Sequence, residues 1–204
     1  MSEHVLQAFG IGVGGRPRPL LPPTDLELWS GEVRALVGEP GHAHAALALV
    51  LAGRLRPDAG DVVLNGVHDE RRRQAAVALV DVPGVSEPDE KVPFGVILGE
   101  ELALAGRPAR RSAVRAWAPD IALGRRTEDT PADRRTELLM RAATLRPKVR
   151  FLVLTLPDRW GVTPAAWQPV AAEIAEQGFG VLVTVGETSR HLLSVPATTI
   201  GDAQ

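Results

Sequence analysis

Short apolar runs alternate with helix-length segments along this 204-residue chain, and this alternation limits its possible folds more than any other feature. Three of the runs, residues 76–80, 151–155 and 180–185, are almost continuously apolar. Strands that are covered on both faces have this composition, as in a parallel sheet flanked by helices. The pattern therefore predicts an α/β fold.

The remaining segments complete the predicted organisation. Further strands are expected at residues 33–37 and 61–64, with a weaker one at 198–201. Helices are expected at residues 45–55, 95–105, 109–118, 133–145 and 164–177, and Thr130 is expected to cap the fourth of them. We expect a single domain over residues 1–204, with a helical subdomain at about 85–146 inserted between core strands.

Composition excludes several classes of function. The chain has no cysteine, which excludes disulfides, zinc-thiolate sites, iron–sulfur clusters and a cysteine nucleophile. The formal net charge is −2, so a general nucleic-acid binder is not expected. No run approaches 18 uncharged apolar residues, and the first ten residues do not resemble a secretory signal. We expect a cytoplasmic protein.

The most informative motif lies between residues 33 and 45. A buried-type strand runs into a turn with Gly38 and Gly41, and then directly into an apolar helix. Phosphate-binding loops have this architecture, because backbone N–H groups and a helix N-terminus face the anion. A tight strand–helix turn without a ligand accounts for the spacing equally well.

The loop lacks most of the side chains that such a site uses. The full pattern is G-x-x-x-x-G-K-[ST], in which the lysine reaches the β- and γ-phosphates and the hydroxyl holds Mg²⁺. The second glycine, the lysine and the hydroxyl are replaced by Ala43, His44 and Ala45. The candidate cofactor-binding residues therefore form a vestigial loop that consists of Gly38, Glu39, Pro40, Gly41, His42, Ala43, His44 and Ala45.

The sequence on both sides of the loop resembles the ATP-binding cassette (ABC) ATPases, the nucleotide-binding subunits of ABC transporters. Residues 29–32 (WSGE) precede the loop, and residues 55–60 (LRPDAG) and 62–66 (VVLNG) follow it, in the order in which that family flanks its Walker A loop. The resemblance covers roughly residues 5–200. It implies a P-loop NTPase-like core sheet flanked by helices, an N-terminal antiparallel β portion and a helical insert.

The resemblance also shows which chemical groups are missing. The region of the Q-loop, residues 80–84, contains no glutamine, and residues 129–133 stand where the family has its LSGGQ signature. The remaining replacements are Val13 for the adenine-stacking aromatic residue, Pro131-Ala132 for the signature glycines, Thr155 for the Walker B aspartate, Leu156 for the catalytic glutamate, Val162 for the D-loop aspartate, and Val185 or Gly186 for the switch histidine.

These replacements predict a degenerate, non-hydrolysing member that has no catalytic residues and no metal site. No cofactor is expected, although weak binding of ATP with Mg²⁺ stays open through the amides of residues 42–45 and a partly cationic His44. The expected partners are an exporter-type membrane subunit at the inner face of the membrane and a second cassette, in a homodimer or heterodimer. The alternatives are a subunit completed in trans by an intact cassette and a free-standing interaction module.

Two segments have two possible roles each. Residues 91–105 follow the pseudo-Q-loop, where the family docks a coupling helix of its membrane subunit, so Phe94, Val96, Ile97 and Leu98 belong either to the core or to an apolar docking surface. Trp160 is expected either in the core or at a dimer-facing edge.

Overall fold

The computed structural model describes residues 3–15 and 17–203. Its strands are β1 Val5–Val13, β2 Leu21–Trp29, β3 Val33–Gly38, β4 Ala59–Leu64, β5 Val77–Val80, β6 Phe151–Thr155, β7 Gly180–Gly186 and β8 Ala197–Thr199. The helices are α1 Ala43–Leu51, α2 Glu70–Ala76, α3 Phe94–Leu104, α4 Arg111–Trp117, α5 Ala132–Thr144 and α6 Pro164–Glu176, with 3-10 turns η1 Pro157–Trp160 and η2 Glu187–Leu192.

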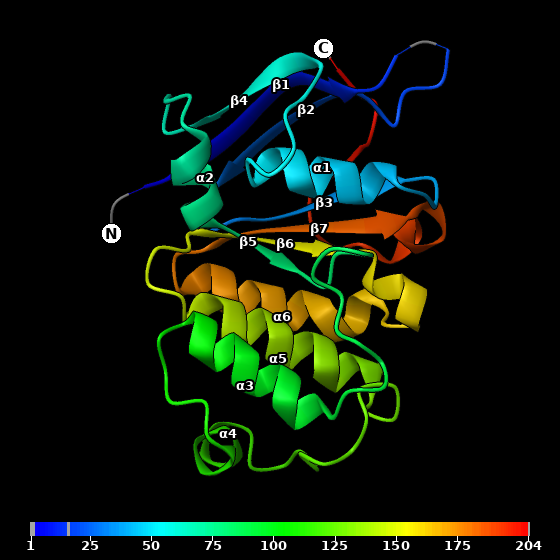
Figure 1. Cartoon of the computed structure of the whole chain (residues 1–204). Coiled ribbons are helices and arrows are strands. Elements are labelled where there is room, and N and C mark those ends of the chain that lie inside the picture. Colours follow the sequence, from blue (N-terminus) through cyan, green and yellow to red (C-terminus); the bar gives the residue numbers. More distant parts are fainter. Residues whose placement is uncertain (1–2, 16, 204) are drawn as a thin grey trace.

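The strands form two sheets (Figure 1). The first is antiparallel, in the order β2-β1-β4, and its register shifts in the second half of β1. The second has the order β5-β6-β7-β3-β8 and is parallel throughout. Every residue of β5, β6 and β7 is buried, which explains why these strands read as continuous apolar runs.

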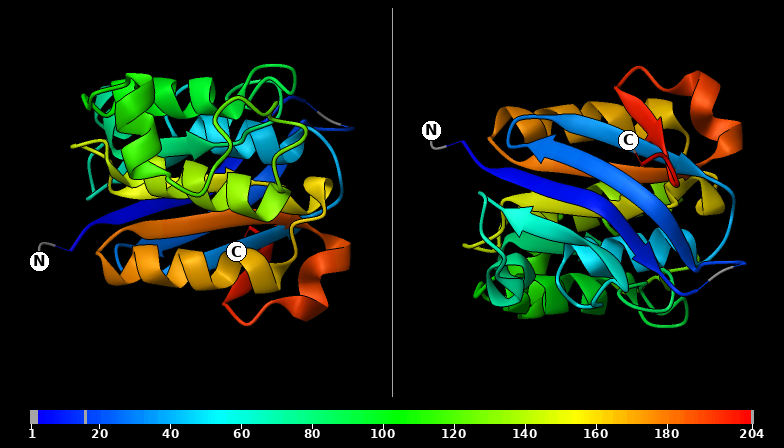
Figure 2. Two further views of the ribbon diagram at one scale, coloured as in Figure 1. Left: turned by 90° about the horizontal axis from the view of Figure 1, so that it is seen from below. Right: turned by 90° about the horizontal axis from the view of Figure 1, so that it is seen from above.

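The helices cover the parallel sheet on both faces. Helix α1 contacts β1 and β2 on one side and β5 and β6 on the other, so it lies between the two sheets. On the opposite face α5 and α6 pack on the parallel strands, α3 packs on α5, and α4 packs on α3. Figure 2 shows these helices covering the sheet from below and the antiparallel sheet covering it from above.

The sequence predictions are confirmed for the α/β class, the six predicted strands and the five predicted helices, with boundaries that shift by up to four residues. One local prediction, the Thr130 cap, is wrong, and the apolar pattern misses α2, β1 and β2, of which the two strands form part of the antiparallel β portion that the resemblance implies. Residues 70–76 form α2, because Asp69 caps the helix by accepting a hydrogen bond from the Arg72 N–H. Helix α5 has Pro131 as its N-cap residue, and the Thr130 hydroxyl instead donates to the Arg126 carbonyl. Residues 5–13 and 21–29 are long strands that the apolar pattern does not predict.

No helix among the described residues is both long and apolar enough to cross a membrane.

Candidate functional site

The carboxyl ends of the parallel strands bring the expected site segments together. Gly38 at the end of β3 pairs with Gly186 at the end of β7, and Thr155 of β6 pairs with Thr184 of β7. The segment that follows β5 begins at Asp81, next to the end of β6. Ligands of open parallel sheets bind at this edge, so the fold places the vestigial loop and the pseudo-Walker B residues where a nucleotide site would lie.

The backbone of the vestigial loop retains a shape that suits an anion. Glu39, Pro40, Gly41 and His42 are exposed, and α1 starts at Ala43. The first N–H groups of a helix have no partner within the helix and carry a partial positive charge. The Glu39 side chain adds a carboxyl group in the same loop, and its negative charge opposes a phosphate.

His44 is turned into the protein and does not reach out toward a ligand. Its side chain is fully buried, and its Nε2 lies 3.1 Å from the Glu39 carbonyl oxygen. Burial lowers the pKa of His44, against the opposing effects of the Glu39 carbonyl and the Asp158 carboxylate. The ring is therefore neutral near pH 7, donates from Nε2 and leaves Nδ1 without a hydrogen-bond partner among the described residues. Burial disfavours the charged form of His44 and so opposes the partly cationic state that the sequence leaves open beside an anion.

The pseudo-Walker B residues offer no carboxylate. Thr155 is buried, and its hydroxyl has no hydrogen-bond partner in the part of the chain that the structure describes. Leu156 has a left-handed backbone, with φ of 50°, and its N–H donates to the Thr184 carbonyl at 2.8 Å. A leucine side chain neither orients water nor accepts a proton, so this position supplies no base.

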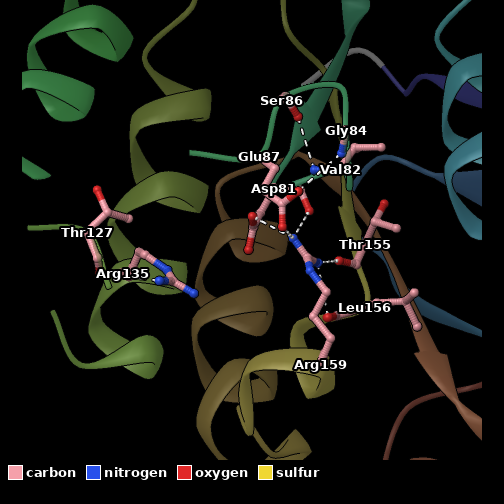
Figure 3. A network of polar contacts seen from close by, with 10 residues as sticks. All are labelled: Asp81, Val82, Gly84, Ser86, Glu87, Thr127, Arg135, Thr155, Leu156 and Arg159. Atoms are coloured by element: carbon pink, nitrogen blue, oxygen red, sulfur yellow. Dashed lines mark hydrogen bonds and ion pairs between the residues drawn. The ribbon is translucent and has the colours of Figure 1, made fainter. Parts of the chain in front are cut away.

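The Arg159 guanidinium connects the ends of β5 and β6 (Figure 3). Its Nη2 donates to Asp81 Oδ1 at 2.8 Å, to the Asp81 carbonyl at 2.9 Å and to Glu87 Oε1 at 3.3 Å. Its Nη1 donates to the carbonyls of Thr155 and Leu156. A positive charge that belongs to the chain itself therefore satisfies the carbonyl oxygens at this edge.

Asp81 is the most perturbed carboxyl group of this cluster. Its side chain is fully buried, and burial raises its pKa from the ordinary value of 3.8 to about 6, although Arg159 and Arg135 lower it. Oδ1 accepts from Arg159, whereas Oδ2 has no hydrogen-bond partner among the described residues. The unfavourable free energy of removing the ionised Asp81 side chain from water thus exceeds the favourable free energy of its interaction with the two arginines.

A second carboxylate, Asp158, anchors η1 on its other side. Asp158 Oδ2 accepts hydrogen bonds from the Gly186 N–H at 2.8 Å and from the Ser189 hydroxyl at 2.9 Å. Together with Arg159, it ties η1 to both β5 and β7. The segment after β6 is therefore cross-linked to its neighbours by side chains, without a ligand.

Trp160 lies over two guanidinium groups at the surface end of this cluster. Arg135 of α5 is 4.6 Å and Arg159 is 5.1 Å from the centre of its ring. Trp160 is half-buried, so the dimer-facing edge stays a prediction. Arg135 is 4% exposed and donates to the Thr127 carbonyl at 3.3 Å.

Val13, the residue at the adenine position, is buried. Phe94 and Leu98 are also buried and belong to the core, whereas Ile97 is half-buried and Val96 is exposed.

The side chains present do not fit a magnesium nucleotide. Among residues 3–15 and 17–203 no three histidine, aspartate or glutamate side chains are grouped closely enough to hold a metal ion. Asp81 and Glu87 both accept hydrogen bonds from Arg159, and Asp158 accepts from Gly186 and Ser189. Of the expected site groups in the described part of the chain, the loop backbone is the one suited to a phosphate.

A groove separates the segment after β5 from α3. Its volume is about 560 Å³, and its lining includes Val85, Asp89, Ile97, Glu100 and Leu104. Val85 and Leu104 are 49% and 64% exposed, which is high for large apolar side chains. The groove therefore presents apolar side chains among carboxylates, with Arg54 and Arg146 also in its lining.

Sequence reasoning did not identify Asp81, Arg135 and Arg159 as a cluster. Asp81 carries one available signal, a lone carboxylate directly after an apolar strand run. The partners of Arg159 are 78 and 72 residues away in the chain, and no local pattern connects them.

The chain is similar in sequence to known ATP-binding proteins, and it covers most of the length of some of them. It is 30% identical over 205 residues to the cytochrome c biogenesis ATP-binding export protein CcmA of Pseudomonas putida, covering 92% of this chain and 91% of that protein. The chain belongs to the ATP-binding cassette family. The ribose import ATP-binding protein RbsA of Cereibacter sphaeroides is 30% identical over 97 residues, which are 48% of this chain and only 19% of that larger protein. No protein-family model matches the chain.

Solved cassette structures have the same fold. A putative ABC transporter ATP-binding protein from Pyrococcus furiosus superposes with a TM-score of 0.68 at 17% identity, over 96% of this chain and 97% of that one. A bacterial Atm1-family ABC exporter with ATP bound gives a TM-score of 0.60 at 16% identity, over 90% of this chain and 35% of the exporter. The sequence-based identification of the family and its fold is confirmed.

Proposed function

We propose that this cassette protein does not hydrolyse ATP and acts as an accessory or inactive partner of an exporter-type membrane protein. One observation carries the proposal: at the edge of the sheet that matches the family's nucleotide site, the side chains are buried, apolar or paired with one another. His44 is buried and neutral, Leu156 supplies no base, and Arg159 occupies the Asp81 and Glu87 carboxylates. Phosphoryl transfer depends on a lysine, a metal ion and a positioned water. The matching positions of this chain have no lysine and no side chain that holds the metal ion or positions the water.

The membrane partner is supported by relatives and by the groove. The P. putida relative is named as an ATP-binding export protein. The groove beside α3 exposes Val85 and Leu104, and Glu100 on its rim forms no ion pair with any described residue. An amphipathic cytoplasmic helix with a basic residue fits this surface, because its apolar face covers the exposed side chains and its charge pairs with Glu100.

The first test is a titration of the purified chain with a fluorescent ATP analogue, with and without Mg²⁺, alongside a phosphate-release assay. We expect no saturation up to about 1 mM, which corresponds to about −4 kcal/mol, and no Mg²⁺-dependent phosphate release, because the buried His44 supplies no exposed positive charge. Micromolar binding that is abolished by His44→Glu would favour a nucleotide-binding subunit completed in trans. Hydrolysis that depends on His44 and Mg²⁺ would contradict the proposal.

The second test concerns the membrane partner. The immobilised chain is expected to retain a multi-spanning membrane protein from detergent-solubilised membranes, and Leu104→Glu is expected to reduce that retention about tenfold, because it places a charge on the apolar centre of the groove. Leu192→Glu is the matched control, since Leu192 is 49% exposed but lies in η2, away from the groove. Equal retention by both variants would exclude the groove, and recovery of only non-membrane proteins would favour a free-standing interaction module.

A further inference from the structure

The segment between β5 and α3 contains a turn that is held together internally. The Val82 carbonyl accepts hydrogen bonds from the N–H groups of Val85, Ser86 and Glu87 at 3.0 to 3.1 Å. In the other direction, the Val82 N–H donates to Ser86 Oγ at 3.1 Å and the Gly84 N–H donates to Glu87 Oε2 at 3.2 Å. These contacts make residues 82–87 a compact unit that can move as one piece.

The Val82 side chain is buried in the core, and polar contacts hold the unit to the rest of the protein near each of its ends. At its far end the Glu90 carbonyl accepts from the Glu128 N–H at 3.1 Å, and Lys91 Nζ forms an ion pair with Glu128 at 2.8 Å. At its near end the polar attachment is Arg159, which holds the Asp81 carbonyl, the Asp81 carboxylate and Glu87. Asp81 itself has a left-handed backbone, with φ of 53°, so the chain bends sharply at the point that Arg159 holds.

This turn forms one wall of the groove beside α3. Val85, Ser86 and Glu87 line the groove from the turn, and Ile97, Glu101 and Leu104 line it from the helix. The helical wall is fixed separately, because Glu101 forms an ion pair with Arg146 at 2.6 Å. The position of the turn therefore sets the width of the groove.

We propose that Arg159 is a positioning residue that fixes the turn at residues 82–87 and so sets the groove to the width its partner requires. Its side chain is 19% exposed, and its acceptors lie directly after β5, on the turn and at the end of β6, so one guanidinium connects three segments. The planar guanidinium suits this task because its donors are held in a fixed geometry. The groove is thus preorganised by an internal cation without nucleotide. The role of the groove in docking rests on the proposed function, whereas the control of the groove's width by Arg159 does not.

The test uses the absence of cysteine from the chain. Spin labels are attached to Val85→Cys and Leu104→Cys, two exposed positions on opposite walls, and the distance between them is measured by pulsed electron paramagnetic resonance. We expect one narrow distance distribution in the parent protein and a distribution about twofold broader with Arg159→Gln, because the turn loses the guanidinium contacts to Asp81 and Glu87 and keeps only the burial of Val82 at that end. Arg190→Gln is the matched control, since it breaks the exposed Glu187–Arg190 ion pair outside the groove and is expected to leave the distribution unchanged.

Glu87→Gln provides a second variant if Arg159→Gln does not fold. The Glu87 side chain is 31% exposed, so the change is tolerated at the surface, and it removes the charged contact between Arg159 and the turn. A smaller broadening in the same direction is expected. Unchanged distributions in the folded variants would overturn the proposal. The measurement needs no partner, so failure to recover a membrane protein would count against the proposed function and not against this role of Arg159.

Discussion

Replacing Ala43, His44 and Ala45 with glycine, lysine and threonine is expected to lower the Kd for ATP with Mg²⁺ by about 10³-fold, or about 4 kcal/mol. The backbone of the loop and the N-terminus of α1 already face solvent, so the missing contribution is that of side chains. Lysine restores a positive charge that the neutral, buried His44 does not provide, and threonine restores a hydroxyl for the metal ion. Titration of both proteins with the same fluorescent ATP analogue measures the gain.

The same triple variant is expected to release no phosphate. Leu156 still occupies the position of the base, and Arg159 still holds the carboxylates at the edge of the sheet. Ala45→Thr alone is the matched control, because it adds the hydroxyl without the charge, and a small gain is expected from it. No gain in affinity from the triple variant would show that the loop backbone itself is closed to phosphate. Phosphate release by the triple variant would show that a base exists elsewhere.

The sequence predicts those elements whose stabilisation is visible in local composition. Residues 151–155 are predicted with their observed boundaries, because the strand is buried on both faces and its first four residues form a continuous apolar run. Helix α2 is missed because its sequence, ERRRQAA, has no apolar periodicity. It is stabilised by the Asp69 cap and by Arg73, which is buried and donates to the Val62 carbonyl of β4 at 2.7 Å. Such a helix is set by tertiary contacts and not by its pattern.

Strands β1 and β2 illustrate the same limit in another form. Glycines interrupt the first strand and two prolines lie in the second, so neither shows regular alternation. In the structure the glycines fall where the register of β1 shifts. Gly60 of β4, with φ of 75°, lies so close to Phe9 and Gly10 that a Cβ there would be 2.3 Å from the Phe9 carbonyl oxygen. The antiparallel sheet therefore follows from the family resemblance and not from the pattern.

The candidate site likewise has features that local sequence predicts and features that depend on tertiary contacts. The sequence locates the loop at residues 38–45 and the missing chemistry at Thr155 and Leu156, because both follow predicted strands. It does not predict what replaces that chemistry. His44 turns inward and Arg159 reaches Asp81 only because the ends of β3, β5 and β6 meet at one edge of the sheet. The ion pair between Arg159 and Asp81 is thus a property of the fold.

Between pH 4 and pH 7 the free energy of unfolding of the wild-type protein is expected to fall by about 2 kcal/mol relative to that of Asp81→Asn. The pKa of Asp81 is about 6 in the folded protein because of burial, against an ordinary value of 3.8. The folded state therefore binds this proton more tightly than the unfolded state. Its contribution to stability is fully present below pH 4 and is lost as the pH rises to about 6. Asparagine does not titrate, so the variant lacks this loss.

Urea unfolding of both proteins at pH 4, 5, 6 and 7 measures the difference, in which the titration of all other groups largely cancels. The charged groups that face Asp81 are Arg159 of η1, Arg135 of α5 and Glu87 of the turn, and all three remain in the variant. Asp120→Asn is the matched control, because Arg134 lowers the pKa of that exposed carboxyl and the expected pH dependence has the opposite sign. If the curves of wild type and Asp81→Asn run parallel, Asp81 is ionised in the folded protein throughout this range. The arginines would then balance its burial fully, and the edge of the sheet would hold a permanent ion pair.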